Sequence, residues 1–186
     1  MANKDAAFGL KAIGKVGQNR DNQGLSEYDI AASATAIYQN DPVKMLATGT
    51  IGVAAAGDVL LGALTGVFFT DASTSKPTYA NHLEASNTAT DIVGFVADDP
   101  YERFEVQSAG TPAQTNIGNC ADISYTAGAS PNYVSKVEIS GTMAAGTAQL
   151  KIIGVSRDPD NNELGSANTN LIVSINEHFL KATAGI

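Results

Sequence analysis

The sequence has little with which to build a covalently or metal-stabilised fold. Its 186 residues include one cysteine, Cys120, and two histidines, His82 and His178, and they include no tryptophan. A single cysteine forms no intramolecular disulfide, and these three residues fall short of a four-ligand structural zinc site. A chain of this length buries about 70% of its unfolded surface and can fold without such support. We therefore expect no cofactor.

Recognisable catalytic motifs are also missing. The sequence contains no phosphate-binding loop, no dinucleotide-binding glycine pattern and no Gly-x-Ser-x-Gly nucleophile elbow. Asp98, Asp99 and Glu102 could form a carboxylate pair of the kind that glycosidases use, but acids beside Pro100 are more typical of a solvated turn. We interpret the chain as a protein that is not an enzyme.

Charged residues are scarce and mostly negative. They make up 16% of the chain, and the formal net charge is −8. Nucleic-acid binding needs a basic face, so an acidic body argues against such a partner. The apolar run over residues 51–69 contains Asp58 near its middle and four glycines, which favours two strands joined at 56–58 over a membrane span. We expect no membrane partner.

The N-terminal segment differs from the rest in charge. Residues 1–20 carry four basic residues and one acid, whereas the remaining 166 residues carry seven bases and eighteen acids. Residues 1–26 sustain no helical or strand period, so we predict an extended arm that seeks an acidic surface, with a solvated, disordered terminus as the alternative. The predicted contact residues of the arm are Lys4, Phe8, Leu10, Lys11, Ile13, Lys15 and Arg20.

Residues 27–186 are predicted to form a β-rich body. Apolar and polar residues alternate around Phe104 and Val106, around Leu150 and Ile152 with Gln149 outward, and from Leu171 to Ile175. This period of two marks half-buried strands, and turn signals separate the runs. The pattern predicts a mainly β chain with a single β-barrel or β-sandwich domain. Alanines between residues 26 and 38 leave one short helix as an alternative.

Two further segments carry candidate binding chemistry. Residues 158–163 open like a calcium loop, but the sixth and twelfth positions hold Glu163 and Thr169 instead of glycine and glutamate, so an Asx-rich turn is the preferred interpretation. Five aromatic residues could form a platform for a sugar or base, although their strand positions favour core packing: Phe68, Phe69, Phe95, Tyr101 and Phe104.

Several segments together resemble a known family. They are residues 1–10, 66–71, 76–78, 98–107, 114–119 and 150–179, the last including Asn176-Glu177-His178. In these segments the chain resembles the head decoration, or cement, proteins of tailed bacteriophages. The resemblance implies a virion protein on the outer capsid surface that clamps neighbouring major capsid subunits. It also implies self-association, commonly as a homotrimer.

The sequence thus leads to three hypotheses. The first is a capsid cement protein whose partners are the major capsid protein and further copies of the chain. The second is another virion component, such as a tail or fibre-associated module. The third is a carbohydrate-binding or hydrolytic domain, in which changing Tyr101 or Tyr125 should abolish glycan binding.

Overall fold

The computed structural model describes residues 3–17 and 24–181, and the prediction of a mainly β chain is confirmed. Two larger antiparallel sheets and a short two-stranded one contain the strands. Within the described ranges the helices are short 3₁₀ turns, η1 (Gln114–Asn116) and η2 (Phe179–Lys181), so the alternative helix over 26–38 does not form. No helix in this part of the chain has the length and apolar character that a membrane crossing requires.

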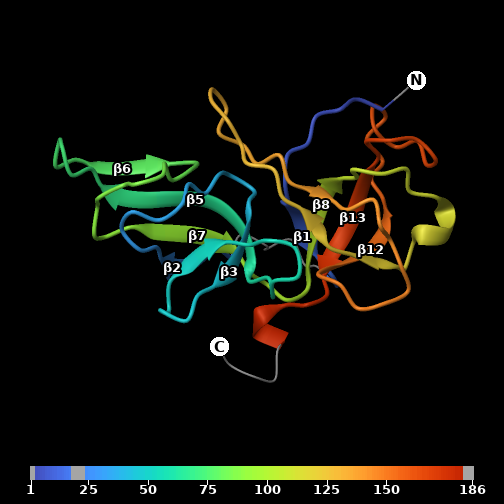
Figure 1. Ribbon diagram of the computed structural model, residues 1–186, viewed down its shortest axis with the longest axis horizontal. Coiled ribbons are helices and arrows are strands. Elements are labelled where there is room, and N and C mark those ends of the chain that lie inside the picture. Colours follow the sequence, from blue (N-terminus) through green and yellow to red (C-terminus); the bar gives the residue numbers. More distant parts are fainter. Residues whose placement is uncertain (1–2, 18–23, 182–186) are drawn as a thin grey trace.

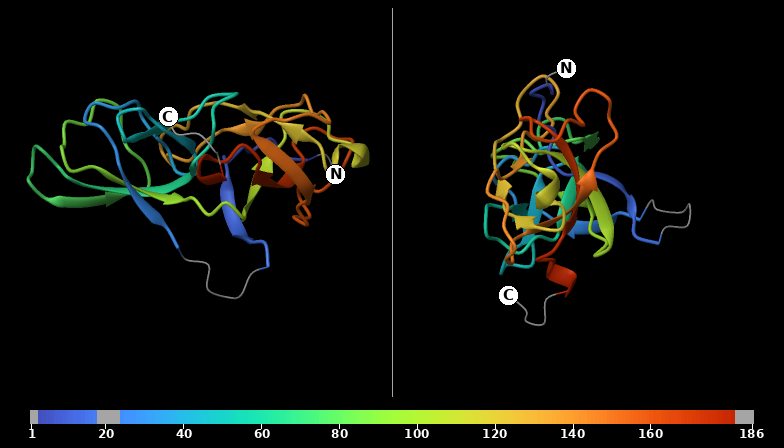
Figure 2. Two further views of the ribbon diagram at one scale, coloured as in Figure 1. Left: turned by 90° about the horizontal axis from the view of Figure 1, so that it is seen from below. Right: turned by 90° about the vertical axis from the view of Figure 1, so that its right-hand side faces the viewer.

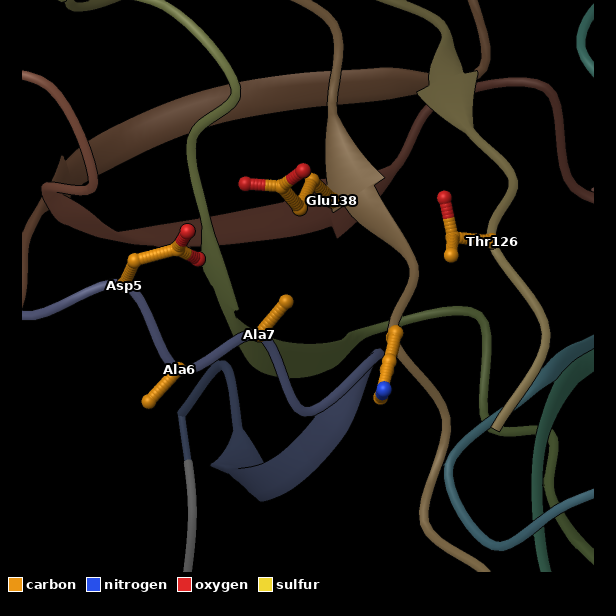
Figure 3. Close-up of a pocket in the computed structure, with 6 residues that line it drawn as sticks. Asp5, Ala6, Ala7, Thr126 and Glu138 are labelled. Atoms are coloured by element: carbon orange, nitrogen blue, oxygen red, sulfur yellow. The ribbon is translucent and has the colours of Figure 1, made fainter. Parts of the chain in front are cut away.

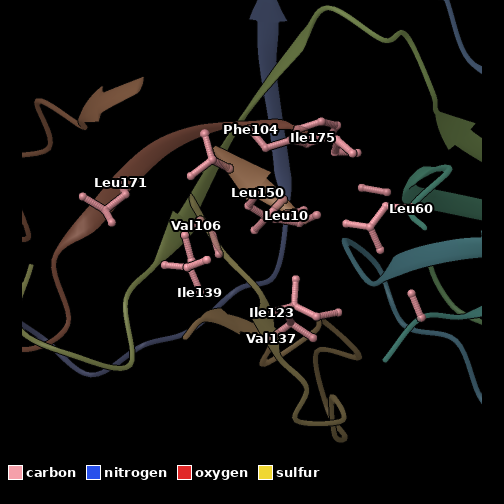
Figure 4. Close-up of a cluster of buried hydrophobic side chains, with 14 of the residues drawn as sticks. Leu10, Leu60, Phe104, Val106, Ile123, Val137, Ile139, Leu150, Leu171 and Ile175 are labelled. Atoms are coloured by element: carbon pink, nitrogen blue, oxygen red, sulfur yellow. The ribbon is translucent and has the colours of Figure 1, made fainter. Parts of the chain in front are cut away.

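The five-stranded sheet forms from the runs whose alternation is clearest. Its order is β1-β8-β13-β12-β9, with bounds Lys11–Lys15, Glu102–Gln107, Asn170–Ile175, Leu150–Val155 and Cys120–Ala121. Phe104 pairs with Val173, which pairs with Ile152, so these three apolar side chains share the inner face. They belong to the first hydrophobic cluster (Figure 4), which the short pair β10 (Ile123–Ser124) and β11 (Glu138–Ile139) helps to close.

The six-stranded sheet has its own hydrophobic cluster. Its order is β2-β7-β5-β3-β4, with β6 added on β5, and its bounds are Ser26–Asp29, Val93–Ala97, Gly62–Thr70, Pro42–Met45, Ile51–Val53 and Pro77–Ala80. The sheet curls, so that β3 and β4 lie across from β5 and β7 in Figure 2. Val43 and Ile51 from one side and Val67 and Val96 from the other fill the space between them.

The two larger sheets lie side by side along the long axis of the molecule (Figure 1). Residues 98–101 connect β7 of one sheet to β8 of the other. The hydrogen-bonded order of each larger sheet ends in edge strands, so no ring of strands closes among the described residues. Both larger sheets therefore keep open edges.

The described part of the predicted arm lies against the body instead of extending from it. β1 pairs with β8, and the side chain of Leu10 is fully buried in the first cluster (Figure 4). The Asn3 side chain donates to the carbonyl of Ala167 over 2.9 Å and to Thr169 Oγ1 over 3.0 Å. The sequence showed no strand period here because β1 is short and contains a bulge between Ala12 and Gly14.

Candidate interaction surface

The cationic side chains of the N-terminal segment meet acids of the chain itself. Lys4 pairs with Asp160, Lys15 Nζ lies 2.8 Å from an Asp99 oxygen, and Lys11 Nζ lies 3.8 Å from a Glu105 oxygen. Hydrogen bonds to their carboxylate partners raise the pKa of Lys4 and of Lys15. The acidic surface that this segment was predicted to seek is thus available on its own body. Arg20 lies outside the described residues.

The predicted apolar anchors have different environments. Leu10 is fully buried, which corrects its assignment as a contact residue: in this fold it can touch no partner. Phe8 is half-buried, and its carbonyl accepts a hydrogen bond from Asn40 Nδ2 over 3.0 Å. Ile13, on the edge strand β1, keeps 42% of its surface exposed. Lys4, Lys11 and Ile13 are therefore the predicted contact residues with exposed side chains, and the last two share the edge strand β1.

The segment 158–163 forms a turn that binds the N-terminus. Asp158 Oδ1 accepts the Asp160 backbone N–H over 3.0 Å, as in an Asx turn, and Asp160 pairs with Lys4. The buried Asn161 side chain donates to the Lys4 carbonyl over 2.8 Å and accepts the Lys4 N–H over 2.9 Å. Across residues 3–17 and 24–181 no group of three or more metal-ligating side chains gathers.

The acids beside Pro100 take structural hydrogen bonds. Asp98 accepts from the Tyr28 hydroxyl over 2.6 Å and from Ser26 Oγ over 2.9 Å. The buried Glu102 accepts the Gly14 N–H over 3.0 Å, and burial raises the pKa of its carboxyl. These contacts fasten the edge strands β2 and β1, each to its own sheet, on either side of the 98–101 connection.

The histidines are also built into the fold. His82 stacks on Tyr133, with ring centroids 3.8 Å apart and planes 2° from parallel. His178 is 2% exposed, and burial lowers its imidazole pKa, helped by the charge of Lys181. On either side of His178, the Glu177 carbonyl accepts the Leu60 N–H and the Phe179 N–H donates to the Leu60 carbonyl. These two bonds tie the chain after β13 to the segment that leads into β5 of the six-stranded sheet.

One surface cavity lies where the N-terminal segment crosses β11. It holds about 390 Å³ and is lined by Asp5, Ala6, Ala7, Thr126, Lys136 and Glu138 (Figure 3). Burial, and then the charge of Asp5, raise the pKa of Glu138. The lining side chains include no histidine or cysteine to pair with the Thr126 hydroxyl. The cavity is a polar recess without a poised nucleophile.

Three rings form an aromatic face on the outer side of the six-stranded sheet, defined by Phe68, Tyr79 and Phe95. Phe68 on β5 pairs directly with Tyr79 on β6, and their ring centroids lie 4.8 Å apart. Phe95 on β7 pairs with Gly66, which has no side chain to cover the ring. The centroid of the Phe95 ring lies 6.4 Å from that of the Tyr79 ring. Tyr79 is 76% exposed, the highest value among the exposed large hydrophobic residues described.

This face differs from the sequence interpretation of the aromatics. Phe104 is core and Phe69 packs against the second cluster, as predicted, but Phe68 and Phe95 point outward. Tyr79 was not among the five aromatic residues considered from the sequence, and it lies on β6, which pairs along β5. Thr78 and Tyr79 after Pro77 were the available signal, since threonine and tyrosine favour strands.

A groove extends the aromatic face at the Phe68 end. It holds about 700 Å³, and its lining includes Asp29, Phe68, Asp91 and Val93. Asp91 Oδ1 accepts the Thr70 N–H over 3.0 Å, and hydrogen bonding by Thr70 lowers the pKa of that carboxyl. The face therefore combines exposed rings with a recess that has both apolar and carboxylate walls.

Comparisons with family models, with curated proteins and with solved structures gave no match to this chain. The function of the surface therefore has to be argued from its own chemistry.

Proposed function

We propose that this chain is a structural virion protein that decorates the outside of a phage head and stabilises contacts between major capsid subunits. The aromatic face carries the proposal: Tyr79 is 76% exposed beside two further rings on a sheet. Exposed aromatic side chains are enriched at protein interfaces and dominate their energetics. The resemblance in residues 98–107 and 150–179 supplies the kind of partner. No catalysis and no cofactor enter this role.

The proposed mechanism is the burial of surface between neighbouring subunits. A stable interface buries about 1,600 Å² in total, and many copies of one contact would reinforce a shell. We propose a homotrimer as the binding unit, in keeping with the family that the chain resembles. For the body we favour a sandwich-type arrangement over a barrel, since both larger sheets end in edge strands.

The proposal moves the main contact from the N-terminal segment to the sheet. Leu10 is buried in the core, and Lys4 and Lys15 face carboxylates of the same chain. Lys11 and Ile13 remain predicted contacts at the exposed edge of β1. The aromatic face becomes the principal anchor because its rings are already ordered, so that binding costs little side-chain entropy.

The test uses heads of the encoding phage assembled without this chain. Wild-type protein should co-sediment with them, and Tyr79→Ala should bind at least about tenfold more weakly because it removes an exposed anchor. Tyr101→Ala is the matched control, since Tyr101 is 62% exposed but lies on the 98–101 connection. Equal binding by both variants would remove the aromatic face from the proposal. Imaging of labelled particles distinguishes a head position from a tail or fibre position.

A carbohydrate-binding role is a second candidate because exposed rings also stack on sugars. The geometry favours a protein partner: the Phe68 ring is tilted by 49° to that of Tyr79, whereas Tyr79 and Phe95 are 16° from parallel. Three rings arranged this way form no flat platform. Glycan binding that is lost in Tyr79→Ala would favour this candidate.

A further inference from the structure

The aromatic face is flanked along one edge by acidic side chains. Glu27 and Asp29 on β2 pair with Phe95 and Val93 on β7, and directly paired residues point to the same side of an antiparallel sheet. Tyr28, between them, packs inward against the second cluster. Both carboxylates therefore lie on the outer side with the rings.

The strands of this face supply no positive side chain, and Lys76 lies just before β6 in the turn that joins it to β5. The strands that build it, β2, β7, β5 and β6, contain neither lysine nor arginine. The carboxylates of Glu27 and Asp29 would lose hydration when a partner covers the rings. An apolar or acidic partner would leave them without compensation, whereas a basic partner would pair with them.

The groove at the Phe68 end suits a long cationic side chain. Phe68 and Val93 offer an apolar wall to the methylenes of a lysine or arginine, and Asp29 and Asp91 offer carboxylates to its head group. Arginine suits this site best, because its planar guanidinium can both stack on a ring and bind a carboxylate through two N–H groups.

From these observations we propose that the aromatic face binds an extended protein segment that turns both apolar side chains and an arginine or lysine toward it. The apolar side chains cover Phe68, Tyr79 and Phe95, and a basic side chain enters the groove between Asp29 and Asp91. The inference rests on the proposed function in one respect: it gives the chemistry of the capsid surface that this face would contact.

The experiment uses the full-length chain and synthetic peptides of about ten residues, long enough to lie along a sheet face. In the first peptide every second residue is leucine or arginine and serine stands between them, so that an extended backbone turns both kinds of side chain to one side. The second peptide replaces arginine by citrulline, which keeps the shape but not the charge, and the third replaces it by glutamate. Fluorescence anisotropy should show binding of the arginine peptide and at least about tenfold weaker binding of the other two. Raising the salt from about 50 mM to about 500 mM should weaken the arginine peptide most.

Matched variants locate the binding. Glu27→Gln combined with Asp29→Asn removes two charges from the face and should weaken the arginine peptide about tenfold. Glu84→Gln combined with Asp158→Asn removes two exposed charges elsewhere and should leave binding unchanged; the amide oxygen that Asp158→Asn introduces would still accept the Asp160 N–H. Amide NMR shifts caused by the peptide should concentrate on β5, β6 and β7.

Any of three outcomes would overturn the inference. The arginine and citrulline peptides could bind equally, the two double variants could have equal effects, or the NMR shifts could be confined to other strands. Sedimentation showing that this face is occupied by a second copy of the chain in solution would overturn it as well. The proposed function fails separately, if wild-type protein does not bind decoration-free heads. Head binding that is unaffected by Glu27→Gln with Asp29→Asn would retain that function and discard the basic partner.

Discussion

Gln149 is a fully buried amide that joins two parts of the fold. Its Nε2 donates to the carbonyls of Ala55 and Asp58 over 2.8 and 2.7 Å, and its Oε1 accepts the Ile123 N–H over 3.0 Å. Ala55 and Asp58 belong to the turn after β4, whereas Ile123 begins β10. One side chain thus binds three backbone groups; the Ala55 carbonyl also accepts the Asp58 N–H over 3.2 Å, whereas Ile123 is buried.

We expect Gln149→Ala to lower the free energy of unfolding by about 2–4 kcal/mol, because unpaired buried backbone groups each carry a desolvation cost. Urea denaturation measures this difference. Gln114→Ala is the control, since Gln114 lies exposed on η1 and should change stability by less than about 0.5 kcal/mol. Similar losses in the two variants would contradict the role given to Gln149.

Asp41 should make stability depend on pH. Its side chain is fully buried; Oδ2 accepts the Tyr38 N–H over 2.8 Å, and the hydroxyls of Ser135 and Tyr125 lie against the carboxyl. Burial raises its pKa from 3.8 to about 6. Between these values the folded chain holds a proton that the unfolded chain releases, so this contribution to stability is present below pH 3.8 and lost as the pH rises through about 6.

Asp41→Asn should therefore stabilise the protein at pH 7 by about 1–3 kcal/mol, because the amide needs no ionisation and still accepts the Tyr38 N–H. The gain should disappear near pH 4, where the wild-type carboxyl is protonated in the folded state. Thermal or urea unfolding at both pH values measures it. Asp158→Asn, at an exposed turn, should show no such trend, and a gain that is the same at both pH values would refute the assignment.

These side chains also mark a limit of sequence reasoning. Alternation predicted the inward positions Phe104, Leu150 and Val173, because burial of one sheet face imposes a period of two. It placed Gln149 outward, whereas the strand begins only at Leu150 and Gln149 turns into the interior. Local pattern cannot show a buried amide whose partners lie 26 and 94 residues away in the chain.

β1 illustrates the same limit for a strand. Its residues show no strand pattern, and they become ordered because β8 offers a free edge and the first cluster offers a site for Leu10. β6 forms for a similar reason, since it pairs along β5. By contrast β8, β12 and β13 were predictable, because they lie next to one another in the sheet and bury a full face.

Removal of residues 1–16 should destabilise the fold instead of producing an intact body without an arm. The deletion takes Leu10 from the core, costing about 2–5 kcal/mol by itself, and exposes the edge of β8. We expect a lower thermal midpoint and more aggregation, seen by circular dichroism and light scattering. Ile13→Ser, which changes an exposed position of β1, should keep the wild-type midpoint; a stable, monomeric deletion variant would restore the free-arm model.

The two hydrophobic clusters share a wall, which couples the two larger sheets. Leu60, Ala63 and Ala97 belong to the first cluster, whereas their neighbours Leu61, Leu64 and Val96 belong to the second. Near the beginning of β5 and the end of β7, neighbouring side chains therefore point into different clusters. Loosening one cluster moves the backbone that supports the other, so we expect the molecule to unfold as one cooperative unit.

Leu61→Ala tests this coupling. The substitution removes side-chain volume from the second cluster alone and should lower the free energy of unfolding by about 2–5 kcal/mol. In one cooperative unit, hydrogen exchange of the slowest amides should accelerate equally in β5 of the six-stranded sheet and in β13 of the five-stranded sheet, because both open only by global unfolding. Leu60→Ala, on the first-cluster side, should accelerate the same two sets. Acceleration confined to the sheet whose cluster lost the side chain would show instead that the two sheets are separate folding units.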